Sequence, residues 1–293
     1  MIHNQFIIRS REGEKLRADL RYVPDGKRKP VIIFLHGFKG FKNWGPFPAV
    51  CESIASSGFI SIAFNFSHNG VGDDLINFTE LDRFAENTFS RELDELSDVI
   101  NAITMLNEIP IEESEIHADA IGLHGHSRGG LVAILGAPHH RAVRAVAAWS
   151  PPSSCNRYTE ARKAEWREKG YLEVENSRTN QIMRLNISLL NDIEKNAESL
   201  NIPVGAKSLT SQEKGLLLIA GSEDLTVRPE ESESIFTQAV KEYSELHIIP
   251  NTGHTFGAEH PNPAIPPPMG KALEKTTTFF RRYLVEYPIP FPE

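Results

Sequence analysis

A serine stands between two glycines at the point where one apolar run ends and another begins. Residues 125–129 read Gly-His-Ser-Arg-Gly, with a strand-like stretch at 120–124 before them and a helix-like stretch at 131–135 after them. This is the G-x-S-x-G pattern of a nucleophile elbow, a sharp strand-to-helix turn that exposes a serine hydroxyl at a helix N-terminus. A Cβ at either glycine would clash where strand and helix approach each other. We therefore expect Ser127 to be a nucleophile.

The same glycines fit two phosphate-binding motifs poorly. The chain contains no G-x-G-x-x-G, and Gly130 is followed by Leu131 instead of the Lys-Ser/Thr of a phosphate-binding loop. The elbow is therefore the preferred interpretation.

A serine nucleophile needs a general base, a group that orients this base, and donors for the oxyanion. In a doubly wound sheet these groups come from loops at the carboxyl ends of strands, in the order Ser, Asp or Glu, His. Asp224 follows a predicted strand at 215–220, and His254 follows another at 245–249. We predict that His254 is the base and Asp224 its orienting carboxylate, with the neighbouring Glu223 as an alternative carboxylate.

Two backbone N–H groups are candidates for the oxyanion site. One belongs to Arg128, the residue after the nucleophile, and the other to Phe38, in the loop after a buried strand at 31–35. Losing one such donor costs on the order of 3 kcal/mol of transition-state stabilisation. We expect His36 to hold this loop, whereas His126 and the Arg128 side chain have no predicted role.

A metal site is the alternative use of the residues around the predicted base. His254, Glu259 and His260 are close in sequence, but their spacing matches no familiar ligand pattern. We expect neither a metal nor a cofactor.

The elements that must position these residues alternate between strand and helix from residue 31 onward. This order predicts an α/β fold with a doubly wound, mostly parallel sheet covered on both faces. An N-terminal antiparallel hairpin, from strands at 5–9 and 16–22, precedes it. The remaining predicted elements are strands at 31–35, 59–66, 120–126, 143–149, 215–220 and 245–249, helices at 47–57, 90–106, 128–135, 229–240 and 271–284, a polar surface loop at 67–88 and a loose tail at 287–293.

Residues 151–210 interrupt this alternation. The segment is highly charged and carries two helical patterns, at about 159–169 and 181–200, with no buried strand. We interpret it as a small helical lid inserted into an α/β core made of residues 1–150 and 211–293.

The composition is that of an ordinary globular protein, with 40% hydrophobic and 24% charged residues. The formal net charge of -8 argues against nucleic acid and anionic membranes as main partners. Cys51 and Cys155 are too few for a disulfide framework, and the N-terminus lacks a basic region followed by a long apolar stretch. The longest apolar runs have strand length. We expect a cytoplasmic protein without a transmembrane helix.

With these residues placed, the sequence resembles the α/β-hydrolase superfamily from about Val31 to Leu284. The resemblance rests on residues 36–38 (His-Gly-Phe), the elbow at 125–129, Asp224 and His254. The N-terminal hairpin, the short lid and the His-Thr-Phe ending at 254–256 resemble the dienelactone-hydrolase-like and acyl-esterase branch, which includes single-domain relatives of the prolyl oligopeptidases. Dienelactone hydrolases typically have a cysteine nucleophile, whereas this chain has a serine; haloalkane dehalogenases and epoxide hydrolases would have a carboxylate.

The resemblance implies a serine hydrolase that cleaves carboxylic esters or related acyl compounds through an acyl-enzyme. A peptidase, thioesterase or acyltransferase with the same triad, or a binding protein that keeps the fold without turnover, are the alternatives. The expected partner is a small-molecule acyl substrate, and a homodimer is possible. Four residues are candidates for an apolar acyl pocket, although packing inside the lid is the competing role for each: Trp149, Trp166, Met183 and Leu185.

Overall fold

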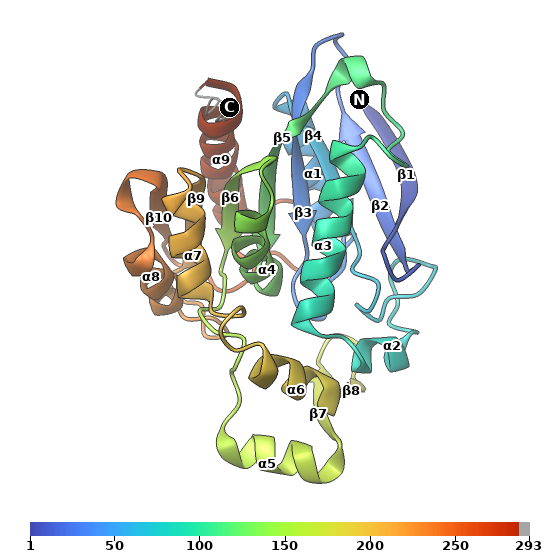
Figure 1. The fold of residues 1–293 in the computed structure, drawn as a ribbon, viewed down its shortest axis with the longest axis vertical. Helices are drawn as coiled ribbons and strands as arrows, with labels where there is room; N and C mark the ends of the chain where they lie inside the picture. The colour runs from blue at the N-terminus through green and yellow to red at the C-terminus, as the bar shows by residue number, and fades with distance from the viewer. Residues whose placement is uncertain (287–293) are drawn as a thin grey trace.

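A computed structural model describes residues 1–286, and the tail predicted at 287–293 lies outside the described residues. Its centre is an eight-stranded sheet in the order β1-β2-β4-β3-β5-β6-β9-β10 (Figure 1). The pairs β1–β2 and β2–β4 are antiparallel, and all other neighbouring strands are parallel. Both the N-terminal hairpin and the doubly wound, mostly parallel sheet are thus confirmed. The strands are β1 (Ile2–Arg9), β2 (Lys15–Tyr22), β3 (Lys29–Leu35), β4 (Ile60–Phe64), β5 (Ile116–His126), β6 (Val143–Trp149), β9 (Gly215–Gly221) and β10 (Ser244–Ile249).

Helices cover both faces of the sheet. In Figure 1, α3, α4 and α7 lie in front of the sheet, and α1 and α9 lie behind it. The central strands β3, β6 and β9 are buried along their whole length, as expected for parallel strands between two helical layers. The helices of this part are α1 (Phe47–Ser56), α2 (Leu81–Ala85), α3 (Phe89–Thr104), α4 (Arg128–Gly136), α7 (Ile202–Ser211), α8 (Pro229–Gln238) and α9 (Pro267–Arg281), with 3₁₀ turns at Glu113–Glu115, Ala137–His139 and Lys241–Tyr243 and a π turn at Arg282–Glu286.

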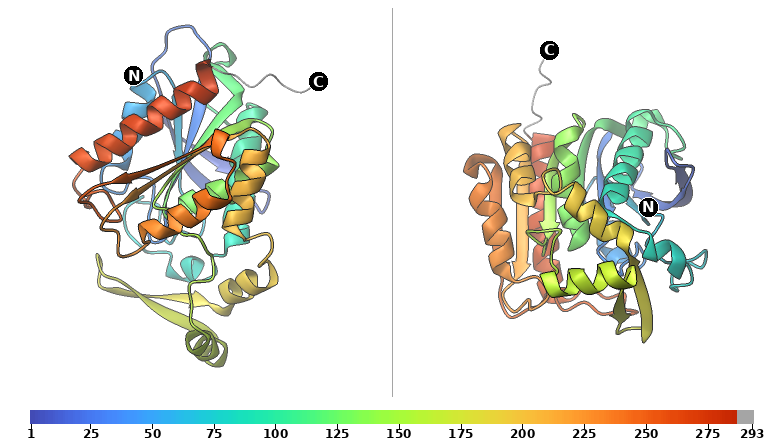
Figure 2. Two further views of the ribbon diagram at one scale, coloured as in Figure 1. Left: turned by 90° about the vertical axis from the view of Figure 1, so that its left-hand side faces the viewer. Right: turned by 60° about the horizontal axis from the view of Figure 1, so that its bottom comes forward.

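The inserted segment lies at the carboxyl ends of the parallel strands, apart from the sheet (Figures 1 and 2). Its first predicted helix is confirmed as α5 (Glu160–Lys169). The helix predicted at 181–200 is wrong in its first part: β8 (Gln181–Asn186) pairs antiparallel with β7 (Tyr171–Asn176), and α6 (Ile187–Lys195) follows. Along β8, buried Met183 and Leu185 alternate with exposed residues, which is a strand period and not a helical one.

Helix α7 falls within the predicted lid range but packs against α4 and α8, which belong to the helical layers of the sheet. The insertion that stands apart from the sheet is therefore α5, β7, β8 and α6. The division of the chain into a core and a lid at residues 151–210 stays a prediction.

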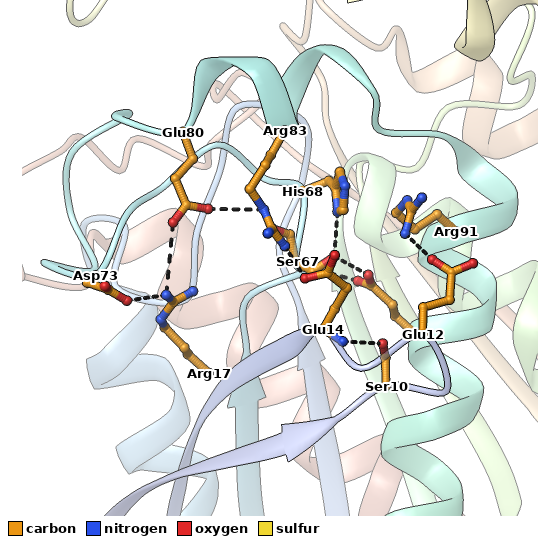
Figure 3. A network of polar contacts seen from close by, with 11 residues as sticks. Ser10, Glu12, Glu14, Arg17, Ser67, His68, Asp73, Glu80, Arg83 and Arg91 are labelled. Atoms are coloured by element: carbon orange, nitrogen blue, oxygen red, sulfur yellow. Dashed lines mark hydrogen bonds and ion pairs between the residues drawn. The ribbon is translucent and has the colours of Figure 1, made fainter.

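The loop predicted at 67–88 is more ordered and more buried than its polar composition suggested. Residues 67–72 are buried, as are Phe78 and Phe84, and the loop contains α2. Ion pairs tie this loop and α3 to the N-terminal hairpin, so the antiparallel edge of the sheet is fixed to the rest of the fold (Figure 3). The pairs are Arg83 with Glu14, Arg91 with Glu12 and Arg17 with Asp73, while Arg83 also pairs with Glu80 inside the loop.

Within residues 1–286, no helix is long and apolar enough to cross a membrane.

Candidate active site

Ser127 occupies a strained turn between β5 and α4. Its backbone φ is 55° and ψ is -122°, a conformation that L-residues rarely adopt. The flanking glycines make the turn possible: a Cβ on Gly125 would lie 2.3 Å from the Gly129 carbonyl oxygen, and one on Gly129 would lie 2.2 Å from the Leu35 carbonyl oxygen. The turn therefore has the geometry expected of a nucleophile elbow.

The three side chains predicted to act together do lie in contact. His254 Nε2 is 2.9 Å from Ser127 Oγ, and His254 Nδ1 is 2.8 Å from Asp224 Oδ2. The residues come from the turn after β5, the loop after β9 and the loop after β10. Asp224 is buried and contacts the histidine, whereas Glu223 is exposed to solvent. Of the two candidate carboxylates, the structure places Asp224 against His254.

The environment of Asp224 favours the ionised carboxylate. Burial alone would raise its pKa, but the hydrogen bond and positive charge of His254 and two backbone N–H donors outweigh burial and lower the pKa of Asp224 below its usual value. These donors are the N–H groups of Thr226 and Val227, each 2.9 Å from Oδ1. Asp224 therefore accepts hydrogen bonds at both carboxylate oxygens and is fixed in the orientation that accepts from His254 Nδ1–H.

His126, which had no predicted role, supports the loop of His254. Its Nε2–H donates to the His254 carbonyl oxygen at 2.9 Å, and the two rings lie 4.9 Å apart. Burial and the neighbouring His254 lower the pKa of His126 to about 3, so this ring is a neutral donor. The position of His126 directly before the nucleophile was the only sequence signal for this role. Its partner is 128 residues away in the sequence, so the contact becomes evident only in the folded structure.

The Arg128 side chain is also assigned by the structure. Its Nε donates to Glu92 Oε2 on α3 at 2.7 Å, and its guanidinium carbon lies 3.9 Å from the centroid of the Phe89 ring. Both charged side chains are buried. This ion pair and the cation–π contact anchor the first residue of α4, whose N–H is one of the two predicted oxyanion donors.

The loop of the second predicted donor lies beside the nucleophile. A Cβ on Gly37 would be 3.1 Å from Ser127 Cβ, so the backbone of this loop approaches the elbow closely. His36 holds the loop as expected, because its Nε2 accepts the Phe66 N–H at 3.3 Å and its Nδ1–H donates to the Gly37 carbonyl oxygen at 3.0 Å. Burial lowers the pKa of His36 to about 4, which keeps the ring neutral. Phe38 follows directly, on the pocket wall.

A cavity of about 430 Å³ opens above Ser127, between the sheet and the insertion. Its apolar wall includes Phe38, Trp44, Phe47, Phe89, Leu131 and Tyr158. The four residues considered for this wall from sequence do not line it in the described part of the chain. All four side chains are buried. Trp166 in α5 and Met183 and Leu185 in β8 are buried within the insertion, as the competing role predicts. Packing inside the lid is wrong for Trp149, which ends β6 and donates its Nε1–H to Thr276 Oγ1 on α9 at 2.9 Å.

The residues considered for a metal site are used otherwise. His260 Nδ1 accepts the Gly45 N–H at 2.9 Å, and its ring stacks on Trp44. In the part of the chain that the structure describes, no group of three or more His, Cys, Asp or Glu side chains is arranged to hold a metal ion. Cys51 and Cys155 are free and buried, and burial raises the pKa of Cys155, on the pocket wall, to about 12. Neither thiol has the low pKa of a nucleophile.

The fold and this site define an α/β-hydrolase of the serine hydrolase class, and the comparisons agree. Residues 86–285, more than half of the chain, match the model of the prolyl oligopeptidase family. The chain belongs to this family. No curated protein sequence matches it.

Solved structures with the same fold cover nearly the whole chain at low sequence identity. The α/β-hydrolase GrgF from Penicillium sp. sh18 is 17% identical with a TM-score of 0.73, covering 97% of this chain and 99% of its own. The esterase domain of a Rhodothermus marinus protein is 18% identical with a TM-score of 0.65, covering 97% and 100%. Est1E from Butyrivibrio proteoclasticus is 19% identical with a TM-score of 0.63, covering 96% and 98%. At these identities the likeness concerns the fold.

Proposed function

We propose that this protein is an esterase that cleaves carboxylic esters of small molecules through an acyl-enzyme, with Ser127, His254 and Asp224 as its catalytic triad. The observation that carries the proposal is the continuous contact from Asp224 Oδ2 to His254 Nδ1 at 2.8 Å and from His254 Nε2 to Ser127 Oγ at 2.9 Å. Nucleophile, base and orienting group are thus all within hydrogen-bonding distance.

In the first half of the reaction, Ser127 Oγ attacks the ester carbonyl while His254 Nε2 takes its proton. The protonated histidine then gives this proton to the leaving alkoxide, and the acyl group stays on the serine. Asp224 keeps the Nδ1 proton in place and stabilises the positive charge that forms on the ring. Water, activated by the same histidine, releases the acid and restores the serine.

The negative charge on the carbonyl oxygen needs donors during both halves. The Phe38 and Arg128 N–H groups are the proposed pair, supported by the close approach of Gly37 to the elbow and by the position of Arg128 at the start of α4. Donors fixed in the backbone need no reorganisation when the charge develops. No cofactor takes part in this scheme.

Steady-state hydrolysis of p-nitrophenyl esters tests the proposal. Ser127→Ala should lower kcat by about 10⁶-fold, because the members of a triad act as a unit. Near wild-type hydrolysis by the purified Ser127→Ala protein would show that the assignment of the nucleophile is wrong.

Peptide-bond cleavage is the second candidate, and membership of the prolyl oligopeptidase family favours it. The same triad can acylate from an ester, amide or thioester, and the pocket walls decide among them. A panel of p-nitrophenyl esters and aminoacyl p-nitroanilides, including prolyl derivatives, separates the two. Because serine peptidases also cleave activated esters, the anilides decide between the two. Cleavage of the anilides that is lost in Ser127→Ala supports the peptidase, and turnover of the esters without cleavage of the anilides supports the esterase.

A further inference from the structure

The charged side chains on the pocket wall are all cations, apart from the histidines. Lys39, Arg128, Arg157 and Arg178 line the cavity, and within residues 1–286 no Asp or Glu side chain does. The positive charge of the pocket wall is thus opposite in sign to the net charge of the whole chain, which is -8. Arg128 and Arg157 are compensated, because each forms an ion pair with a glutamate outside the wall, on α3 and α8 respectively.

Lys39 and Arg178 are held by neutral groups instead. Lys39 Nζ donates to the Glu175 carbonyl oxygen at 2.8 Å, and Arg178 Nη2 donates to the Lys39 carbonyl oxygen. Within residues 1–286, neither side chain forms an ion pair with a carboxylate. A carbonyl oxygen carries only a partial charge, and the Glu175 carboxylate acts on Lys39 only from beyond ion-pair distance, so neither positive charge is neutralised by direct contact. We call this pair the cationic end of the pocket.

The cationic end is continuous with the catalytic centre. Lys39 is two residues beyond Gly37, whose backbone approaches Ser127, and Arg178 reaches in from the turn between β7 and β8. The guanidinium carbon of Arg178 lies 5.7 Å from the centroid of the Trp44 ring. From Trp44 the aromatic wall continues through Phe47, 5.1 Å away, towards the histidines of the site.

Two observations indicate that the cationic end is built to receive an anion. First, burial and the charge of Arg178 lower the pKa of Lys39 and outweigh the opposing charge of Glu175, and burial also lowers the pKa of Arg178, so both cations are held in surroundings that disfavour their charge. Second, the pocket residue Asn176 is 1% exposed, and its buried Nδ2 has no hydrogen-bond partner. An unpaired buried donor costs free energy that an acceptor from a ligand would recover.

We propose that the cationic end binds a carboxylate of the substrate, so that the preferred esters carry a free carboxylate in addition to the scissile ester. A planar carboxylate can accept from a guanidinium, an ammonium and an amide at once. This inference rests on the proposed esterase function. The carboxylate belongs to either the acyl part or the alcohol part, and the experiment distinguishes them.

Two matched substrate pairs test the proposal. Mono-p-nitrophenyl adipate and its methyl ester differ by one charge in the acyl part, and 3-acetoxybenzoate and its methyl ester differ by one charge in the alcohol part. In one of the pairs the wild-type protein should show a kcat/KM at least about tenfold higher for the anionic member. The pair that shows the preference identifies the part that carries the carboxylate.

Arg178→Gln should lower this anionic-to-neutral ratio by about tenfold, and Arg178→Lys should retain part of it. Arg184→Gln is the matched control, because it removes one positive charge from the same hairpin. Arg184 lies over the Tyr171 ring, is 58% exposed at its side chain and does not line the pocket. The Arg184→Gln variant should leave the anionic-to-neutral ratio of kcat/KM unchanged.

Equal kcat/KM values within both pairs, or a preference that survives both Arg178→Gln and Lys39→Gln, would overturn the proposal while leaving the esterase function intact. If no ester is turned over at all, the proposed function fails, and adipate binding measured by calorimetry tests the site without catalysis. Binding that weakens about tenfold in Arg178→Gln but not in Arg184→Gln supports the carboxylate site. The absence of adipate binding to the folded wild-type protein contradicts it.

Discussion

The buried ion pair between Arg128 and Glu92 gives a strong test of how the elbow is held. Arg128 Nε and Glu92 Oε2 are 2.7 Å apart, with only 9% and 6% of the two side chains exposed. Glu92 Oε1 accepts from Asn87 Nδ2 at 2.7 Å, and Arg128 Nη2 is buried without a partner. Glu92→Ala would therefore leave a buried guanidinium without its counter-charge.

Breaking a buried pair from one side costs about 3–5 kcal/mol, because the remaining charge stays desolvated and unpaired. We expect the free energy of unfolding of Glu92→Ala to fall by this amount, measured by urea denaturation. Arg128→Met/Glu92→Leu, which removes both charges, should recover most of the loss. A loss below about 1 kcal/mol in Glu92→Ala, or a double variant as unstable as the single one, would refute this reasoning.

Asp94→Ala is the matched control on the same helix. Asp94 pairs with Arg11 at 3.0 Å, but its side chain is 57% exposed and that of Arg11 is 50% exposed. An exposed pair of this kind contributes about 0–1 kcal/mol, so the control should unfold close to the wild-type midpoint.

Three further results are expected. Gly129→Ala should lower kcat/KM by more than about 100-fold or prevent folding, because its Cβ would lie 2.2 Å from a backbone oxygen of β3. Gly270→Ala in α9 is the control: nothing lies within 4 Å of its Cβ, so it should stabilise the protein by about 0.5–1 kcal/mol. Similar behaviour of the two variants would contradict this prediction. Asp224→Asn should lower kcat by about 10⁴-fold on p-nitrophenyl esters, because the amide favours the wrong tautomer of His254, and a loss under tenfold would exclude the proposed role. Burial raises the pKa of Glu95 to about 7 from a usual 4.5, so between these pH values the folded state binds more protons than the unfolded state. The free energy of unfolding should therefore fall as pH rises from about 5 to 7. Glu95→Gln should flatten this pH dependence in urea titrations, and an unchanged pH dependence in the variant would argue against the prediction.

The sheet and the three contacting side chains could be predicted because their signals are local. Most strands of the sheet contain a short apolar run, and Ser127, Asp224 and His254 each stand in the turn or loop that follows a predicted strand. Parallel strands bring their carboxyl ends to one edge of the sheet, so the order of the elements was enough to expect the three loops to meet.

The pocket walls and the insertion could not be predicted in the same way. The sequence pattern predicts a helix where β8 lies, because an alternation of only six residues is hard to distinguish from the start of the helical pattern of α6 that follows it. The partner of Arg128 is Glu92, 36 residues away on α3, and no spacing rule links them. Likewise, Trp44 and Arg178 meet only because the hairpin of β7 and β8 folds back over the site.

Labelling with a fluorophosphonate probe tests the central claim most directly, because the probe reacts with a serine only when a base activates its hydroxyl. We predict one adduct per folded chain, located by mass spectrometry on Ser127 and absent from Ser127→Ala, with much slower labelling of His254→Ala. A folded wild-type protein that stays unlabelled, or that carries the adduct on another residue, would contradict the account.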